Sequence, residues 1–78
     1  MSEIKEDRVL DVQGEGCPMP ILKAKKALDK MNSGEILKIL GTDPGTKNDL
    51  PAFCKRTGHE FLGAEENEEV FTFYVKRK

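Results

Sequence analysis

Hydrophobic and polar positions in the first half of the chain follow two different periods. Residues 8–13 place apolar side chains densely enough for a short strand, which Gly14 and Gly16 then interrupt. After Pro18 the apolar residues recur at helical spacing, at Ile21, Ala24, Ala27, Leu28 and Met31. The polar and glycine residues 32–34 supply a stop. This pattern predicts a strand followed by a helix.

The middle of the chain repeats this order. Residues 35–40 are too short for a typical helix and apolar enough for a buried strand, and residues 41–45 form a loop rich in turn residues. Thr46 and Asp49 have the spacing of a capping box, and apolar positions continue at helical spacing up to Gly58. Pro51 would remove a helical hydrogen bond, so we expect the regular helix to begin nearer Asp49.

The last third predicts a hairpin. Strands are expected at about 60–64 and 70–76, around a polar turn at 65–69. The predicted order is βαβαββ, an α/β (α+β) fold with a four-stranded mixed sheet. Its first two strands are parallel through a right-handed crossover, and both helices cover one face. We expect one domain spanning residues 1–78, with residues 1–7 as a disordered amino terminus.

Length and composition limit the kinds of function. A chain of 78 residues has little material for a deep pocket, which favours a site carried on the surface. The formal net charge of -1 gives no reason to expect nucleic acid or an anionic membrane as a partner. The polar, acidic amino terminus lacks the apolar core of a secretory signal, and no apolar run reaches transmembrane length. We therefore expect a cytoplasmic protein whose two cysteines are not a structural disulfide.

Cys17 is the principal candidate for chemistry, because it stands directly before a helix that starts with Pro18 and Pro20. Both prolines fall in the first turn, where backbone N–H groups have no partner inside the helix, so they fix the geometry at little cost. The helix dipole favours a thiolate there by about 0.3–1 kcal/mol, and the acidic Glu15 is close. The Met19 N–H remains as the donor for a capping sulfur. This predicts a moderately reactive thiol, suited to accepting and releasing sulfur.

Two other residues have alternative interpretations. Cys54 shares a helical stripe with apolar residues, which favours a place in the core, and a resolving thiol for Cys17 is the alternative. His59 could act as a base beside Cys17 or join the cysteines around zinc. Zinc normally needs four ligands, so we expect no metal, and a helix-cap or strand-start role for His59 is favoured.

The first helix carries candidate docking residues. Met19 and Leu22 lie outside its apolar arc and close to Cys17, which indicates either a docking patch or isolated surface hydrophobes. Lys23 and Lys26, together with Lys30, lie opposite that arc. They form either a solvated face or a surface that attracts an acidic partner or tRNA phosphates.

Several motifs together resemble the TusA/SirA/YedF family of small sulfur-carrier proteins. The resemblance covers about residues 8–78 and rests on Leu10-Asp11, Cys17-Pro18-Met19-Pro20, Asp43-Pro44-Gly45-Thr46, Asp49-Leu50-Pro51-Ala52-Phe53-Cys54 and Gly58-His59-Glu60. It implies a two-layer sandwich and a persulfide carried on Cys17 with no cofactor. Family members that serve tRNA thiolation typically carry an arginine where this chain has Gly16, so the resemblance leaves the pathway open.

The predicted function is a sulfurtransferase that acts as a persulfide relay, with weak or no turnover without partner proteins. The resemblance implies a cysteine desulfurase or rhodanese-like protein as sulfur donor and an acceptor protein in tRNA thiolation, cofactor sulfuration or sulfur metabolism. Two alternatives stay open. One is a redox or regulatory module using a Cys17–Cys54 disulfide, and the other is a small RNA-binding domain.

Overall fold

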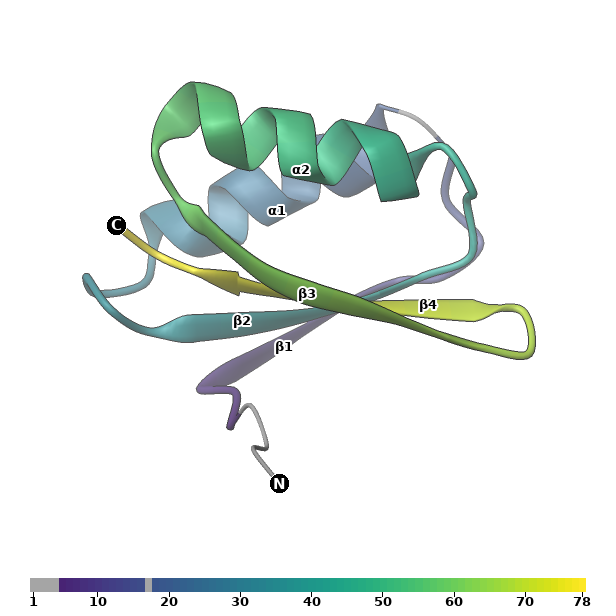
Figure 1. The fold of residues 1–78 in the computed structure, drawn as a ribbon, viewed down its shortest axis with the longest axis horizontal. Coiled ribbons are helices and arrows are strands. Elements are labelled where there is room, and N and C mark those ends of the chain that lie inside the picture. Colours follow the sequence, from purple (N-terminus) through teal and green to yellow (C-terminus); the bar gives the residue numbers. More distant parts are fainter. Residues whose placement is uncertain (1–4, 17) are drawn as a thin grey trace.

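The fold follows the predicted order of strands and helices. The structure, a computed structural model, describes residues 5–16 and 18–78 (Figure 1). Its elements are β1 (Arg8–Val12), α1 (Met19–Asp29), β2 (Ile36–Gly41), α2 (Thr46–Thr57), β3 (Glu60–Asn67) and β4 (Val70–Lys76). Part of the predicted disordered terminus, residues 1–4, lies outside the described residues. Asp7 is described, and its N–H donates to the Ile36 carbonyl at 2.8 Å.

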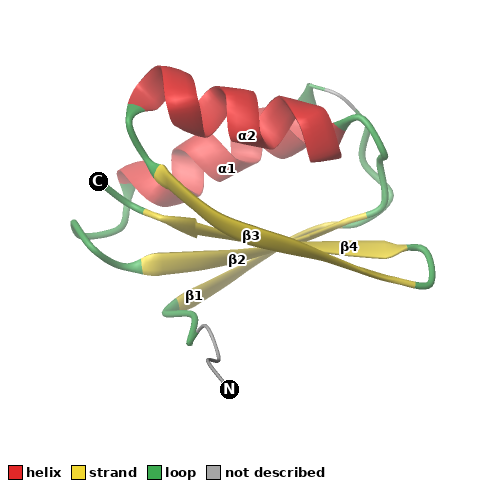
Figure 2. Cartoon of the chain, viewed as in Figure 1, coloured by secondary structure: helices red, strands yellow, loops and turns green. Residues whose placement is uncertain are grey.

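The four strands form one mixed sheet in the order β1-β2-β4-β3. β1 and β2 are parallel, whereas β4 is antiparallel to both of its neighbours. Both helices lie on the same face of this sheet, as Figures 1 and 2 show, so the predicted two-layer arrangement is confirmed. The carboxyl ends of β1 and β2 and the amino ends of α1 and α2 meet at one end of the molecule, on the right in Figure 1.

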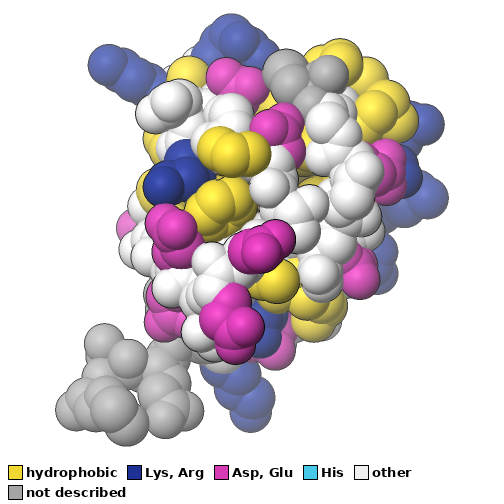
Figure 3. Space-filling model, turned by 90° about the vertical axis from the view of Figure 1, so that its right-hand side faces the viewer, with side chains coloured by type: hydrophobic (Ala, Val, Ile, Leu, Met, Phe, Trp, Pro, Cys, Tyr) yellow, Lys and Arg dark blue, Asp and Glu magenta, His cyan; other side chains and the backbone are white. Residues whose placement is uncertain are grey.

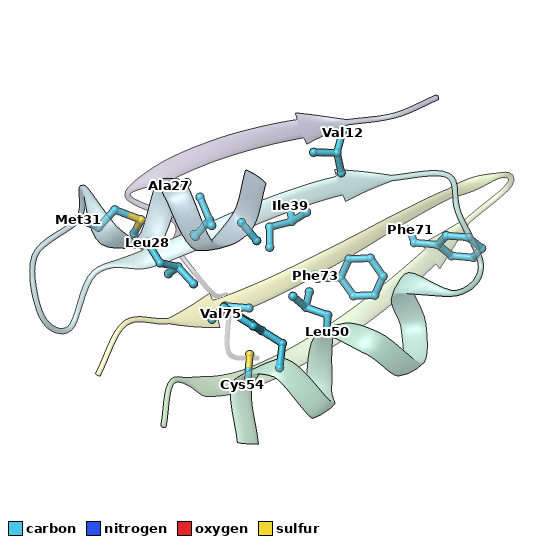
Figure 4. Close-up of a cluster of buried hydrophobic side chains, with 13 residues drawn as sticks. Val12, Ala27, Leu28, Met31, Ile39, Leu50, Cys54, Phe71, Phe73 and Val75 are labelled. Atoms are coloured by element: carbon cyan, nitrogen blue, oxygen red, sulfur yellow. The ribbon is translucent and has the colours of Figure 1, made fainter. Parts of the chain in front are cut away.

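The hydrophobic core lies between the helices and the sheet (Figure 4). Alternate residues of the two central strands are buried, as expected for strands with one covered face. The largest fully buried side chains include Leu28 from α1, Leu37 from β2, Leu50 from α2 and Phe73 from β4. Each such side chain contributes about 1.5–3 kcal/mol when it leaves water. The core therefore holds both helices to the sheet.

α1 is confirmed as a helix, but it ends earlier than the predicted stop at residues 32–34. Its last helical residue is Asp29. The N–H of Lys30 donates to the Ala27 carbonyl at 3.1 Å, so the final turn tightens. The Leu28 carbonyl accepts from the Met31 N–H at 3.0 Å and from the Arg77 Nε–H at 2.7 Å. Met31 remains buried beyond the helix, as its place in the apolar pattern indicated.

The prediction for the start of α2 was wrong. The helix begins at Thr46, not near Asp49, and its N-cap is Gly45 with no side-chain cap hydrogen bond. The reason is a turn before the helix, in which the Thr46 N–H donates to the Asp43 carbonyl at 3.1 Å. Pro51 is accommodated inside the helix. In the described part of the chain, no helix is both long and apolar enough to cross a membrane.

β3 extends further than predicted. It runs to Asn67, so residues that the sequence placed in a turn pair with β4 instead, including Glu65 opposite Thr72. The turn itself is short and includes Glu68 at a positive φ of 59°. A run of glutamates has low strand propensity, and pairing with the apolar β4 overrides that preference.

Candidate functional site

The loop between β1 and α1 is anchored to the rest of the fold on both sides of the predicted nucleophile. Cys17 itself lies outside the described residues. Before it, the Gly14 N–H donates to the Thr42 Oγ1 at 2.8 Å, and Gly14 takes a positive φ of 83°. Thr42 directly follows β2, so this bond ties together the two loops that meet at this end of the sheet. The sequence showed a loop around Thr42, but nothing in it indicated the contact.

After the cysteine, the two prolines have different surroundings. Pro18 is exposed and serves as the N-cap of α1, where its carbonyl accepts from the Leu22 N–H at 3.1 Å. Pro20 is fully buried. Proline has no N–H to leave unsatisfied in the first turn, so both residues suit this position. Pro20 therefore also fastens the start of the helix to the core, a role that the sequence did not reveal.

The prediction for the Met19 N–H was wrong. It donates to the Gly16 carbonyl at 3.0 Å. The N–H is therefore already used by the backbone and is not a free cap for a sulfur atom. What remains of the predicted activation is the amino end of α1, whose dipole favours negative charge by at most about 1 kcal/mol.

Glu15 is paired within the chain. The Lys23 Nζ, from the second turn of α1, forms an ion pair with the Glu15 carboxylate. Both side chains are partly exposed. The pair balances the negative charge that the sequence places next to Cys17. It also occupies Lys23, one of the three lysines that were interpreted as either a solvated face or a docking surface. An ion pair between residues of a loop and a helix gives no recognisable spacing in the sequence.

Met19 and Leu22 lie at the surface, as predicted. Their exposed fractions are 40% and 48%, and both belong to the first turns of α1. Ile21, between them in sequence, packs against the core instead. Figure 3 views this end of the molecule and shows hydrophobic side chains at the surface among acidic and basic ones. A partner that approaches the loop would therefore meet apolar surface beside it.

Cys54 belongs to the core, which confirms the favoured interpretation. It is 1% exposed, carries a free thiol and lies on the sheet-facing side of α2, near Leu50 and Val75 (Figure 4). Burial raises the pKa of this thiol to about 11, because a thiolate there would lose its hydration. Such a thiol is a weak nucleophile at neutral pH.

His59 lies at the opposite end of the helical layer from Gly16 and Pro18. It stands directly after the C-cap of α2 and before β3, so the predicted strand-start role is confirmed. Its Nδ1 accepts from the Lys78 N–H at 3.2 Å. Burial lowers the pKa of His59, with a further contribution from the positive Lys78. Among the described residues, no group of three His, Cys, Asp or Glu side chains could hold a metal ion.

Comparisons with known proteins agree with this architecture. The sequence model of the family described as Sulfurtransferase TusA matches residues 8–77. A protein of Neisseria meningitidis serogroup A is 52% identical over 69 residues, which cover 88% of this chain and 93% of that protein. The sulfur carrier protein TusA of Allochromatium vinosum is 45% identical over 71 residues, covering 91% and 93% respectively.

A solved structure has the same fold. The crystal structure of a SirA-like protein from Desulfitobacterium hafniense superposes with a TM-score of 0.73 at 25% sequence identity. The match covers 88% of this chain and 95% of the other. The four-stranded mixed sheet with two helices is therefore an arrangement already seen by crystallography.

Proposed function

Because the chain belongs to the TusA family of sulfurtransferases, whose named members are sulfur carriers, we propose that it carries sulfur as a persulfide on Cys17. The observation that supports this most is the position of the cysteine in sequence. It stands between an anchored glycine-rich loop and a helix whose first turn contains Pro18 and the buried Pro20. This geometry fixes the chain on both sides of the thiol while its neighbours Gly16 and Pro18 stay exposed.

The proposed reaction is two successive thiol exchanges. The Cys17 thiolate attacks the outer sulfur of a donor's persulfide, an S–S bond forms to Cys17 Sγ, and the donor's own S–S bond breaks. The donor leaves as a thiolate with the electron pair. An acceptor thiolate then attacks the same outer sulfur and releases the Cys17 thiolate. Neither step needs an oxidant or a cofactor.

The modest activation expected at Cys17 suits such a relay. A thiol with a strongly lowered pKa is a poorer nucleophile and a better leaving group, so it would accept sulfur slowly. A carrier needs both steps to be feasible. Neither neighbouring charge should shift the reactivity of Cys17 strongly. Lys23 neutralises the carboxylate of Glu15, and the dipole of α1 stabilises a thiolate only slightly.

The donor is proposed to be a cysteine desulfurase or a rhodanese-like protein in the cytoplasm, and the acceptor another protein of a sulfur relay. Turnover without these partners should be weak, because a chain this small cannot enclose a substrate. Met19 and Leu22 are proposed docking residues, since they are exposed apolar side chains within the first turns of α1. Lys26 is a further candidate, and Lys23 contributes through its pair with Glu15.

Intact-mass analysis after incubation with a cysteine desulfurase and cysteine tests this proposal. The wild type should gain the mass of one sulfur atom, the gain should disappear with a thiol reductant, and Cys17→Ser should gain nothing. Cys54→Ala is the matched control and should load like the wild type, because Cys54 is buried. Equal loading of Cys17→Ser, or loading lost in Cys54→Ala while that variant stays folded, would contradict the assignment.

A further inference from the structure

An open groove runs between α1 and the edge strand β1, with a volume of about 340 Å³. Its lining residues are Arg8, Val9, Leu10, Lys23, Lys26, Ala27 and Lys30. We call it the α1–β1 groove. Lys23 lies at the end of the groove near the Cys17 loop, because it pairs with Glu15 of that loop. Lys30, one residue beyond the last turn of α1, lies at the far end.

The groove carries more positive charge than the chain as a whole would suggest. Four of its lining residues are basic and none is acidic, although the formal net charge of the chain is -1. Lys23 is neutralised by Glu15. Arg8, Lys26 and Lys30 form no ion pair with any residue that the structure describes. Such a concentration of uncompensated charge attracts a negatively charged partner.

The strand side of the groove is also open. β1 lies at the end of the sheet order and pairs only with β2 within the described chain. Leu10 and Val12 of this strand pack toward the core, so the 53% exposed side chain of Val9 lies on the face of the sheet that the helices leave uncovered. An edge strand presents unpaired backbone donors and acceptors, and an extended segment of another protein can add to it as a further strand.

The spacing of the charges fits such a segment. Lys26 lies three residues after Lys23 and four before Lys30, which corresponds to about 4.5 and 6 Å along the axis of α1. Alternate side chains of an extended strand lie about 6.6 Å apart on the same face. Acidic residues at alternate positions of an extended segment would therefore face successive lysines, while its backbone runs along β1.

We propose that the α1–β1 groove binds an extended acidic segment of the protein that exchanges sulfur with Cys17. This inference rests on the proposed function and adds the kind of partner and its place of contact. The segment carries carboxylates at alternate positions and lies along β1, with its charges toward Arg8, Lys26 and Lys30. Because the groove leads to the loop of Cys17, binding there brings the partner's reactive sulfur toward the thiol.

RNA is the less suitable occupant. Base recognition on single strands relies on aromatic side chains that stack with the bases. No aromatic side chain lines the groove, and Phe53, Phe71 and Phe73 are buried in the core. Apolar strand residues and an open backbone edge favour a polypeptide instead.

Binding of a synthetic peptide tests the groove directly. The probe is a short peptide in which glutamate alternates with threonine, and its control has glutamine in place of glutamate. Backbone amide shifts in the NMR spectrum should change along β1 with the glutamate peptide only. Lys26→Glu combined with Lys30→Glu should weaken binding roughly five- to thirtyfold, because each exposed ion pair is worth up to about 1 kcal/mol.

The matched control is Lys25→Glu combined with Lys55→Glu. It makes the same change in net charge on exposed helical positions that do not line the groove. This variant should bind the glutamate peptide within about twofold of the wild type, allowing for long-range electrostatics. Equal weakening by both variants, equal binding of the glutamine peptide, or binding of a single-stranded RNA oligonucleotide in place of the peptide would overturn the proposal.

Loading kinetics separate this inference from the proposed function. Loading by a desulfurase and release to an acceptor protein are measured beside loading by inorganic polysulfide, which needs no docking. The groove variant should be slowed in at least one protein step by a clearly larger factor than with polysulfide, whose negative charge feels the altered field but which does not bind as an extended segment. Unchanged rates in both protein steps would overturn the role of the groove in sulfur exchange. If Cys17 takes sulfur from no donor, the proposed function fails, and the peptide experiment still decides whether the groove binds acidic segments.

Discussion

The two cysteine segments of this chain show how packing determines what a thiol can do. Cys54 lies within α2, whereas Cys17 precedes α1 in sequence, and the two helices cover the same face of the sheet and each contain a proline. Cys54 points into the core from the middle of α2 and is almost completely buried. The segment around Cys17 instead ends a loop, and its described neighbours Gly16, Pro18 and Met19 are exposed.

The burial of Cys54 determines its role. Burial raises the pKa of the Cys54 thiol to about 11 and removes it from contact with reagents, so Cys54 acts as a small hydrophobic residue. It also weighs against the redox alternative, because a disulfide requires both sulfurs to approach closely and a partly unfolded α2 would be needed to release Cys54. The following predictions test the comparison.

Thiol alkylation should show the largest difference. In Cys17→Ser, which leaves Cys54 as the sole cysteine, iodoacetamide should react at least about a hundredfold more slowly in buffer than in denaturant at neutral pH. A rise in pKa from 9.0 to about 11 alone lowers the thiolate fraction about a hundredfold, and burial adds to this. In Cys54→Ala the native and denatured rates should differ much less. Rapid native labelling of Cys54 would contradict its place in the core.

Stability should separate the two cysteines next. Cys54→Ser should lower the free energy of unfolding by about 1–3 kcal/mol, since it buries a hydroxyl in an apolar site. Cys17→Ser should change it by less than about 0.5 kcal/mol, because its described neighbours are exposed and substitutions at the surface usually have effects this small. Urea unfolding followed by circular dichroism gives both values. Losses of equal size would mean that Cys17 also supports the fold.

The sequence predicted the elements far better than their ends or their contacts. Apolar periodicity identified both helices and all four strands, because burial on one face of the sheet imposes it on each element. The start of α2 was missed because the turn at Asp43 depends on backbone geometry, and the length of β3 because pairing with β4 overrides the preference of its glutamates.

Within the candidate site, the sequence predicted that Met19 and Leu22 are exposed, and the structure confirms this. The sequence could not show contacts between residues that only the fold brings together. The Gly14–Thr42 hydrogen bond joins positions 28 residues apart, and the Glu15–Lys23 pair joins a loop to a helix. Arg8 is the first residue of β1 and Lys30 follows the last residue of α1, so the two are far apart in the sequence. Only the fold shows that they line the same groove.

Ionisation of the Cys54 thiol should lower the free energy of unfolding at alkaline pH. The folded-state pKa is raised above the unfolded value of 9.0, so the unfolded chain ionises first. The contribution of the Cys54 thiol to the free energy of unfolding is therefore fully present below about pH 9. It falls between pH 9 and 11, and the loss is roughly 1.4 kcal/mol at pH 10. Other groups titrate in this range, so the measurement is the difference between wild type and Cys54→Ala in urea unfolding. A difference that does not change with pH would contradict the burial of the thiol.

The smallest expected effect is a loss of unfolding free energy in acid, caused by His59 just after the end of α2. Burial and the charges of Lys78 and Arg77 lower the pKa of His59, so the unfolded chain binds a proton more readily than the folded one. Stability from this group is present above the unfolded pKa of about 6.5 and is lost as the pH falls through the lower folded value. His59→Gln should flatten this part of the profile of unfolding free energy against pH without changing sulfur loading of Cys17. A loading defect in that variant would instead place His59 in the relay and end its assignment to the strand start.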